Sequence, residues 1–327
     1  MTANPQPGPR ADAPRIAVTV CTRERPTMLQ ACLASIIGDA AGDRGSGAVL
    51  IVVVENDVEP SCAAAVRALD TDAVPVVYVH EPRLGIPQAR NAAVAAALAR
   101  DADWIVFVDD DETVLPGWTA ALKAAVARGT ADVYTGPVEI VLAASRPDWM
   151  PPPKAKRRRD GTALGTAATN NTAAAARLFR PDGLALSFDE RLRFTGGSDD
   201  DLFRRAVAAG VRIEWAAAMA VCETWPAARL TLSFHLDRAR RVGENNMRAM
   251  RRRRGLPAAC LRYLPKAIGR AAHGGLEVVI SVLMRPIHAV RGLRLQVSGR
   301  RRIAYAVGII RGLAGKTSAP YRDVVGK

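Results

Sequence analysis

Short apolar runs alternate with stretches of helical periodicity through the first third of the chain. Four runs rich in Val and Ile predict strands buried on both faces of a parallel sheet, at residues 15–20, 49–54, 74–79 and 104–108. Between them, apolar positions recur with a helical period at residues 27–37, 62–69 and 86–100. This alternation predicts an α/β fold, a doubly wound and mostly parallel sheet of Rossmann-like type.

After residue 112 the pattern is mixed. Residues 115–128 and 202–209 have helical periodicity, and residues 133–143 predict a strand. Residues 166–179 fit a strand and a helix equally. Arg-rich segments with helical periodicity follow residue 226.

Polar residues follow two of the predicted strands, at the sheet edge where ligands of such folds bind. Asp109, Asp110 and Asp111 follow the fourth strand. Three adjacent carboxylates repel one another unless a cation neutralises them, and Mg²⁺ and Mn²⁺ prefer oxygen ligands shared with phosphates. Glu55 and Asn56 follow the second strand, where polar side chains commonly contact a base or ribose. The alternatives are a solvated acidic turn for the first group and a turn cap for the second.

Two predicted helices begin with residues that could bind a phosphate or act as a general base. Residues 85–91, GIPQARN, place Arg90 in a first helical turn, whose free N–H groups favour phosphate. Residues 195–201, TGGSDDD, combine glycines that permit close backbone approach with carboxylates that could act as a general base. Each has an ordinary alternative, a plain amphipathic helix for the first and acids stabilised by the helix dipole for the second.

Five segments in this order resemble the motifs of the family 2 glycosyltransferases. They are residues 18–37, 52–57 (VVVEND), 81–93 (EPRLGIPQARNAA), 106–112 (VFVDDDE) and 196–204 (GGSDDDLFR). The resemblance covers about residues 15–250. It implies a GT-A type fold and an inverting enzyme of the kind that builds bacterial cell-surface glycans.

The resemblance also assigns roles on the donor side. Thr22 lies where the family's first loop contacts the nucleoside. Glu55 and Asn56 lie where an acidic pair meets the base, and Arg90 lies near the nucleotide. The D-x-D segment would contact the donor through Asp109 and Asp110 and hold Mn²⁺ or Mg²⁺ through Asp109 and Asp111, with Asp111 the more direct metal ligand.

On the acceptor side, the resemblance makes Asp199 the catalytic base. The Glu that usually precedes this base is Ser198 here, and three consecutive Asp residues allow the alignment to slip toward Asp201. The implied reaction is direct displacement at the anomeric carbon with inversion. The Q-x-x-R-W motif of processive synthases is absent from the sequence, which favours a single sugar addition.

The positive charge is concentrated at the C-terminal end. The chain carries a net charge of +14, while residues 227–327 hold 22 Lys and Arg against 4 Asp and Glu. Apolar segments are interleaved with this charge, which is typical of basic helices lying on an anionic membrane surface. The alternative is that these helices pack against the catalytic domain or a second subunit, with their arginines in solvent. Nucleic acid is a poor alternative because this region has few aromatics and no recognisable binding motif.

We therefore expect a disordered N-terminus at residues 1–14, a nucleotide-binding half at 15–112, an acceptor-binding half at 113–226 and a basic helical extension at 227–327. The five cysteines include no C-x-x-C pair, and such a sparse, odd-numbered set is typical of a protein in a reducing cytoplasm. No stretch approaches membrane-spanning length, so the expected location is the cytoplasmic face of the cell membrane. The acceptor would be a glycan or a lipid-linked sugar.

Two other functions remain open from the sequence. A nucleotidyltransferase acting on sugar phosphates would share the sheet, metal and nucleotide, but the turn after the first strand lacks the glycines of its usual phosphate loop. A non-enzymatic polyanion-binding protein would explain the basic C-terminal third alone.

Overall fold

The computed structural model describes residues 13–43, 45 and 47–316, so most of the expected disordered segment 1–14 lies outside the described residues. The chain forms two compact units. Unit 1 takes residues up to 138 together with 156–189 and 202–222, and unit 2 takes 139–155, 190–201 and 223 onward. The expected halves at residues 15–112 and 113–226 concern ligand contacts, which this division by packing does not test.

Unit 1 contains the mostly parallel sheet expected from the sequence. Its eight strands have the order β3-β2-β1-β4-β9-β6-β10-β8. The first four in the chain pair in parallel and are β1 (Ile16–Thr22), β2 (Val49–Glu55), β3 (Val76–His80) and β4 (Trp104–Asp109). The others are β6 (Val133–Thr135), β8 (Ala163–Leu164), β9 (Thr172–Ala175) and β10 (Ile213–Trp215), of which β9 runs antiparallel to both β4 and β6.

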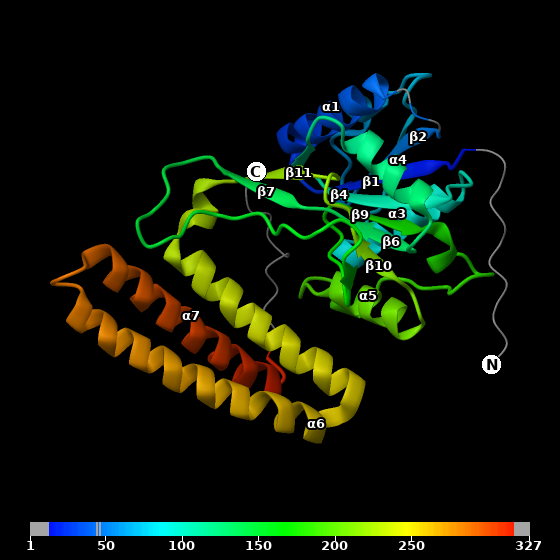
Figure 1. The fold of residues 1–327 in the computed structure, drawn as a ribbon. Helices are drawn as coiled ribbons and strands as arrows, with labels where there is room; N and C mark the ends of the chain where they lie inside the picture. Colours follow the sequence, from blue (N-terminus) through cyan, green and yellow to red (C-terminus); the bar gives the residue numbers. More distant parts are fainter. Residues whose placement is uncertain (1–12, 44, 46, 317–327) are drawn as a thin grey trace. The chain divides into compact units, whose positions relative to one another are not determined.

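Helices cover both faces of this sheet because its buried strands are apolar on both sides (Figure 1). Ile16 and Val18 of β1 pack with α1 (Pro26–Gly42), α2 (Ala63–Arg67) and α4 (Trp118–Arg128). Ala17 faces the other way, in the cluster that includes α3 (Ile86–Leu98) and the part of α5 (Ser198–Ala208) from Leu202 onward. Among the described residues, 3₁₀ turns lie at Ala176–Leu178, Glu190–Leu192 and Ala227–Leu230.

The single strand expected at residues 133–143 is wrong, because it is broken at Gly136 and Pro137. A Cβ atom on Gly136 would lie 1.8 Å from the backbone oxygen of Met219, so the chain turns at a position that only glycine can occupy. After the break comes β7 (Val138–Leu142), which belongs to a smaller sheet of order β5-β11-β7 with β5 (Glu112–Val114) and β11 (Val221–Trp225).

Unit 2 contains the basic helical extension expected from the sequence. Its helices are α6 (Leu232–Met284) and α7 (Ala289–Leu313). Gly255, with φ 80° and ψ 171°, interrupts α6 and divides it into two rods, which lie beside α7 (Figure 1). Glycines bring the backbones together: a Cβ on Gly308 of α7 would lie 2.0 Å from the backbone oxygen of Arg240 on α6.

One helix among the described residues, α6, is long and apolar enough to span a membrane, contrary to the expectation from the sequence. An 18-residue window in it has a mean hydropathy of 1.3 and is 17% buried. Residues 278–284 of α6 form a short apolar run. The helix also includes the Ala and Gly residues before this run, so its apolar part is longer than the run alone. A single helix of this kind is weak evidence for a membrane span.

Candidate active site

The order of the strands indicates a candidate ligand site between β1 and β4. The chain moves from β1 to β2 and β3 on one side, and then returns to β4 on the other side of β1. In doubly wound sheets, ligands bind outside the carboxyl ends of the strands at this switch point. The register pairs Cys21 of β1 with Asp109 of β4, so the loops after the two strands meet there.

Asp110 joins these two loops. The residue is 5% exposed, and its carboxylate accepts hydrogen bonds from Thr22 Oγ1 at 2.8 Å and from Arg25 Nη1 at 3.0 Å. Burial raises the pKa of Asp110, and the positive charge of Arg25 opposes that rise. Because the bonds cross between segments 85 or more residues apart in the chain, they hold the turn after β4 in place.

Asp109 and Asp111, on either side of Asp110, are placed differently from it. The side chain of Asp109 is 45% exposed, and its Oδ1 lies 3.6 Å from Arg90 Nη2. Asp111 Oδ2 lies 3.7 Å from Arg25 Nη1. The backbone N–H of Asp109 donates to the buried carboxylate of Glu112 at 3.1 Å. Each outer carboxylate therefore has an arginine close by.

Arg90 is positioned by α3 and its packing. The helix begins after Gly85, whose φ of 143° suits glycine. The guanidinium of Arg90 stacks over the Phe188 ring at 5.7 Å. Asn91 fixes the backbone of Phe188 from both sides, donating to its oxygen at 3.0 Å and accepting from its nitrogen at 2.9 Å. This framework presents the Arg90 charge at the Asp109 carboxylate.

Glu55 is buried and bonded to its own loop. Its carboxylate accepts hydrogen bonds from the N–H and hydroxyl of Ser61, both at 2.7 Å, from the Cys62 N–H at 3.1 Å and from the Tyr78 hydroxyl at 2.6 Å. Burial alone would raise the pKa of Glu55, but the bonds from Tyr78 and Ser61 outweigh it and lower that pKa to about 2. Glu55 therefore organises the loop after β2, and its contact with a nucleotide base stays a prediction.

Asn56 has a similar local role. Its side chain donates to the backbone oxygens of Glu81 and Arg83 at 2.8 and 3.0 Å and accepts from the Gly85 N–H at 2.7 Å. These bonds fix the loop that leads into α3 and so help to set the position of Arg90. A direct contact between Asn56 and the donor likewise stays a prediction.

The carboxylate turn fits a divalent cation that a substrate helps to hold. Among the residues that the structure describes, no group of three or more His, Cys, Asp and Glu could hold a metal without other ligands. Mg²⁺-type sites usually use one or two carboxylates and complete their shell with waters and substrate phosphates. Asp109 and Asp111 supply two such carboxylates, while Asp110 is buried in the bonds that support them.

The segment containing Asp199 belongs to unit 2. Gly196 and Gly197, with φ of 75° and 86°, bend the chain into α5. Asp199 Oδ1 accepts a hydrogen bond from the Asp200 N–H at 2.8 Å, and Asp201 Oδ1 lies 3.6 Å from Arg253 Nη2. The pairing of Asp201 with a cation favours Asp199 as the base, which stays a prediction.

Comparison with known proteins identifies the family. The model of glycosyl transferase family 2 matches residues 17–182. The succinoglycan biosynthesis protein ExoM of Rhizobium meliloti (strain 1021) is 30% identical over 305 residues, which cover 92% of this chain and 93% of that protein. The chain belongs to glycosyl transferase family 2.

Solved structures similar to this glycosyltransferase confirm the GT-A type fold. The mannosyltransferase PcManGT from Pyrobaculum calidifontis, in complex with GDP-Man and Mn²⁺, is 18% identical with a TM-score of 0.56, covering 92% of this chain and 88% of that one. S. aureus TarS in complex with UDP is 15% identical with a TM-score of 0.51, covering 92% of each chain.

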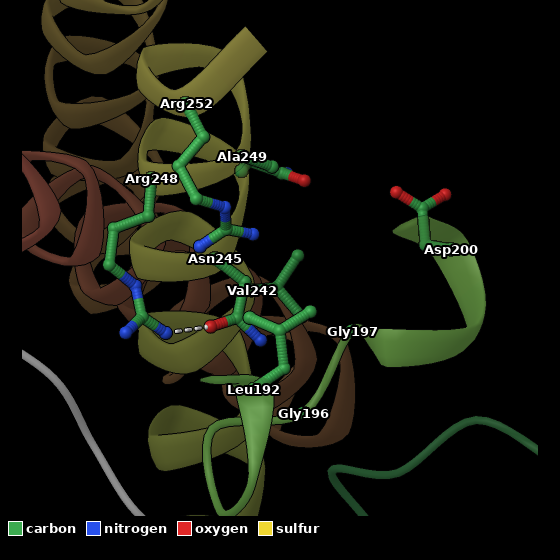
Figure 2. Close-up of a pocket in the computed structure, with 10 residues that line it drawn as sticks. Leu192, Gly196, Gly197, Asp200, Val242, Asn245, Arg248, Ala249 and Arg252 are labelled. Atoms are coloured by element: carbon green, nitrogen blue, oxygen red, sulfur yellow. Dashed lines mark hydrogen bonds between the residues drawn. The ribbon is translucent and has the colours of Figure 1, made fainter. Parts of the chain in front are cut away.

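Sequence reasoning about this glycosyltransferase missed Arg25, which contacts both Asp110 and Asp111. The signal was present, because Arg23 and Arg25 lie in the turn directly after the first predicted strand, and that turn meets the acidic turn at a switch point. It also missed a cavity of about 190 Å³ in unit 2 (Figure 2). Its polar lining comes from two segments, and includes Gly196, Gly197, Asp200, Asn245, Arg248 and Arg252.

Proposed function

We propose that this glycosyltransferase is an inverting hexosyltransferase that adds one sugar from a nucleoside-diphosphate donor to a hydroxyl of a cell-surface polysaccharide or glycolipid precursor. The observation that carries the donor side is the carboxylate turn at the switch point, flanked by Arg25 and Arg90. Its relative ExoM is named for succinoglycan biosynthesis, and similar structures contain UDP, UDP-GlcNAc or GDP-Man.

The donor would bind at the carboxyl ends of β1 and β4, with Thr22 beside the nucleoside. Arg90 is near enough to Asp109 to contact the same diphosphate. Asp109 and Asp111 would hold Mn²⁺ or Mg²⁺, which when bound neutralises charge on the departing diphosphate. Asp110, through Thr22 and Arg25, keeps these carboxylates in position.

Asp199 would act as the general base. Its carboxylate takes the proton of the acceptor hydroxyl as that oxygen forms a bond to the anomeric carbon. The bond between the anomeric carbon and the diphosphate oxygen breaks in the same step, and the nucleoside diphosphate leaves with that electron pair. Because attack and departure occur on opposite faces, the anomeric configuration inverts.

The donor and the stereochemistry can be tested without knowing the acceptor. A thermal-shift screen of UDP-, GDP- and dTDP-sugars with and without Mn²⁺ should identify one donor that raises the melting temperature only with metal. With that donor and water as acceptor, NMR of the first sugar released should show the inverted anomer. A retained anomer would contradict the mechanism, and no response to any sugar nucleotide would contradict the donor class.

We also propose that unit 2 holds the enzyme on the cytoplasmic membrane face. The end of α6 and the turn after it expose a group of large apolar side chains, each at least 59% exposed, at Leu276, Val279, Val282, Leu283 and Ile287. Arginines at 285, 291 and 294 lie beside them in the sequence, and each basic residue near an anionic surface contributes about 1 kcal/mol. Lying on the surface suits this segment better than spanning, because Glu277 within it bonds Arg302 at 2.9 Å.

Flotation of the full chain with vesicles tests this location. The wild type should float with anionic vesicles at low salt. A double substitution, Leu283→Ser with Ile287→Ser, should reduce flotation, while Leu261→Ser, at a residue 81% exposed elsewhere on α6, serves as the matched control. Equal loss in the control, or flotation unchanged by the double substitution, would count against this surface.

A further inference from the structure

The cavity in unit 2 is lined by two arginines from α6, by the first turn of α5 and by the glycines that precede it. Arg248 and Arg252 are four residues apart, so they lie on the same face of the helix (Figure 2). Gly196, Gly197 and Asp200 form the facing wall. All of these residues belong to the same unit.

The charges around this cavity are unbalanced. Arg248 and Arg252 together face one lining carboxylate, Asp200. Arg248 Nη2 donates to the neutral side chain of Asn245, and Arg248 Nε is buried without a hydrogen-bond partner among the described residues. Burial lowers the pKa of Arg248 and the like charge of Arg252 lowers it further, while the buried Glu244 carboxylate, which also bonds Arg311, opposes this shift. Arg248 is partly buried and Arg252 is exposed on the next turn of the helix, so an anion lying between the two guanidiniums would stabilise both charges.

We propose that this cavity binds a phosphate or diphosphate group of the acceptor. A guanidinium binds two oxygens of an anion through its planar fork. One arginine is enough for the two oxygens of a carboxylate, whereas two arginines on successive turns can each contact a pair of phosphate oxygens. The cavity of about 190 Å³ is smaller than a typical pocket for a whole small molecule, about 300 Å³ or more, and so suits a charged group at one end of a longer substrate.

The position of the cavity connects this anion to the reaction. Its wall residues Gly197 and Asp200 flank Asp199, the proposed base, in the sequence. A phosphate anchored by Arg248 and Arg252 would therefore bring the adjoining sugar of the acceptor close to Asp199. This inference rests on the proposed function, and it narrows the acceptor to a phosphorylated one.

Phosphate binding to the full-length protein can be measured by ³¹P NMR titration with inorganic phosphate in EDTA, so that no metal recruits phosphate to the D-x-D turn. Arg252→Ala should weaken binding about tenfold or more, the usual effect of losing a charge-assisted hydrogen bond. Arg248→Gln should do the same. Arg251→Ala and Arg254→Ala remove the same charge from exposed neighbours outside the cavity lining, and should change binding less than twofold.

Equal weakening by all four substitutions would overturn the site, because diffuse positive charge would then explain the binding. Acetate that binds as tightly as phosphate at the same ionic strength would overturn the phosphate assignment. Mn²⁺-dependent sugar-nucleotide binding, measured on the same samples, separates this inference from the proposed function. If donor binding is intact but Arg252→Ala leaves phosphate binding unchanged, only this inference is refuted. If the wild type does not bind any donor, only the proposed function is refuted.

Two further probes identify where the phosphate comes from. A sugar 1-phosphate in solution represents a soluble phosphorylated glycan, and an alkyl diphosphate in neutral vesicles represents a lipid-linked acceptor. The source is the one represented by the probe that binds more weakly to Arg252→Ala than to the wild type but binds equally well to Arg254→Ala. If neither probe binds in the wild type, the proposed site is wrong.

Discussion

Replacing Glu55 by glutamine should destabilise the protein by about 3 kcal/mol at pH 7, and the loss should disappear in acid. The carboxylate accepts hydrogen bonds from Ser61, Cys62 and Tyr78, which lower its pKa from 4.5 to about 2. Each unit of difference between the folded and unfolded pKa corresponds to about 1.4 kcal/mol. Glutamine keeps the shape of the side chain but not its charge, so the variant loses this contribution.

The pH dependence follows from the direction of the shift. A carboxyl whose pKa is lowered on folding stabilises the protein fully above its unfolded value, near 4.5, and the contribution is lost as pH falls toward 2. The difference between wild type and Glu55→Gln should therefore be constant from pH 8 to about pH 5, fall below half near pH 3 and vanish close to pH 2. Urea denaturation of both proteins across this range measures it.

Two variants make this test specific to Glu55. Tyr78→Phe removes the donor at 2.6 Å and should cost about 2 kcal/mol, since a bond to a charged group is worth about 1.5–3 kcal/mol. Glu59→Gln removes a carboxylate from an exposed position in the same loop and should change stability by less than about 0.5 kcal/mol. The reasoning is refuted if Glu55→Gln costs no more than Glu59→Gln, or if its cost is the same at pH 7 and pH 3.

Three further predictions concern the metal, the base and the helix packing. Asp111→Asn should abolish the Mn²⁺-dependent part of donor binding in calorimetric titrations. Unchanged metal dependence would mean that the metal does not bind at this turn. Asp199→Asn should retain donor binding and lose about 100-fold or more in turnover, whereas an active Asp199→Asn beside an inactive Asp201→Asn would move the base by two positions. Gly308→Ala should lower the melting temperature because its Cβ would overlap the backbone of α6, while Gly269→Ala, which meets nothing within 4 Å, should be neutral or stabilising. Equal melting temperatures for these two glycine variants would contradict the close approach of the helices.

The pattern of the sequence predicts the first four strands and the helices between them because each strand is a short apolar run rich in Val and Ile. It does not resolve residues 166–179, where an Ala-rich stretch suits either period. Within that stretch, residues 172–175 become β9 through pairing with β4 and β6, which no local pattern records, and residues 176–178 form a 3₁₀ turn. The GT-A fold was therefore predictable, and the details of its second half depend on long-range pairing.

The candidate site shows the same limit at the level of single residues. The sequence locates Glu55 at a strand end, but not the donors from Ser61, Cys62 and Tyr78 that satisfy its carboxylate. Likewise, Arg248 is one arginine in a basic region, and only the folded helix shows that its Nε is buried. Tertiary packing decides which polar groups are buried together, and this cannot be predicted from the local pattern of a single sequence.

Unit 2 is built from three separate stretches of the chain, and this limits how chimeras between this enzyme and its relatives can be made. Asn245 on α6 donates to the backbone oxygen of Thr195 at 3.1 Å, and Arg253 pairs with Asp201 at 3.6 Å, so the C-terminal helices pack on a segment from the middle of the chain. A chimera with one crossover before residue 223 would join helices from one parent to residues 139–155 and 190–201 from another. The proposed acceptor site, Asp199 with the neighbouring cavity, can therefore be transplanted with its packing intact only by exchanging all three stretches together.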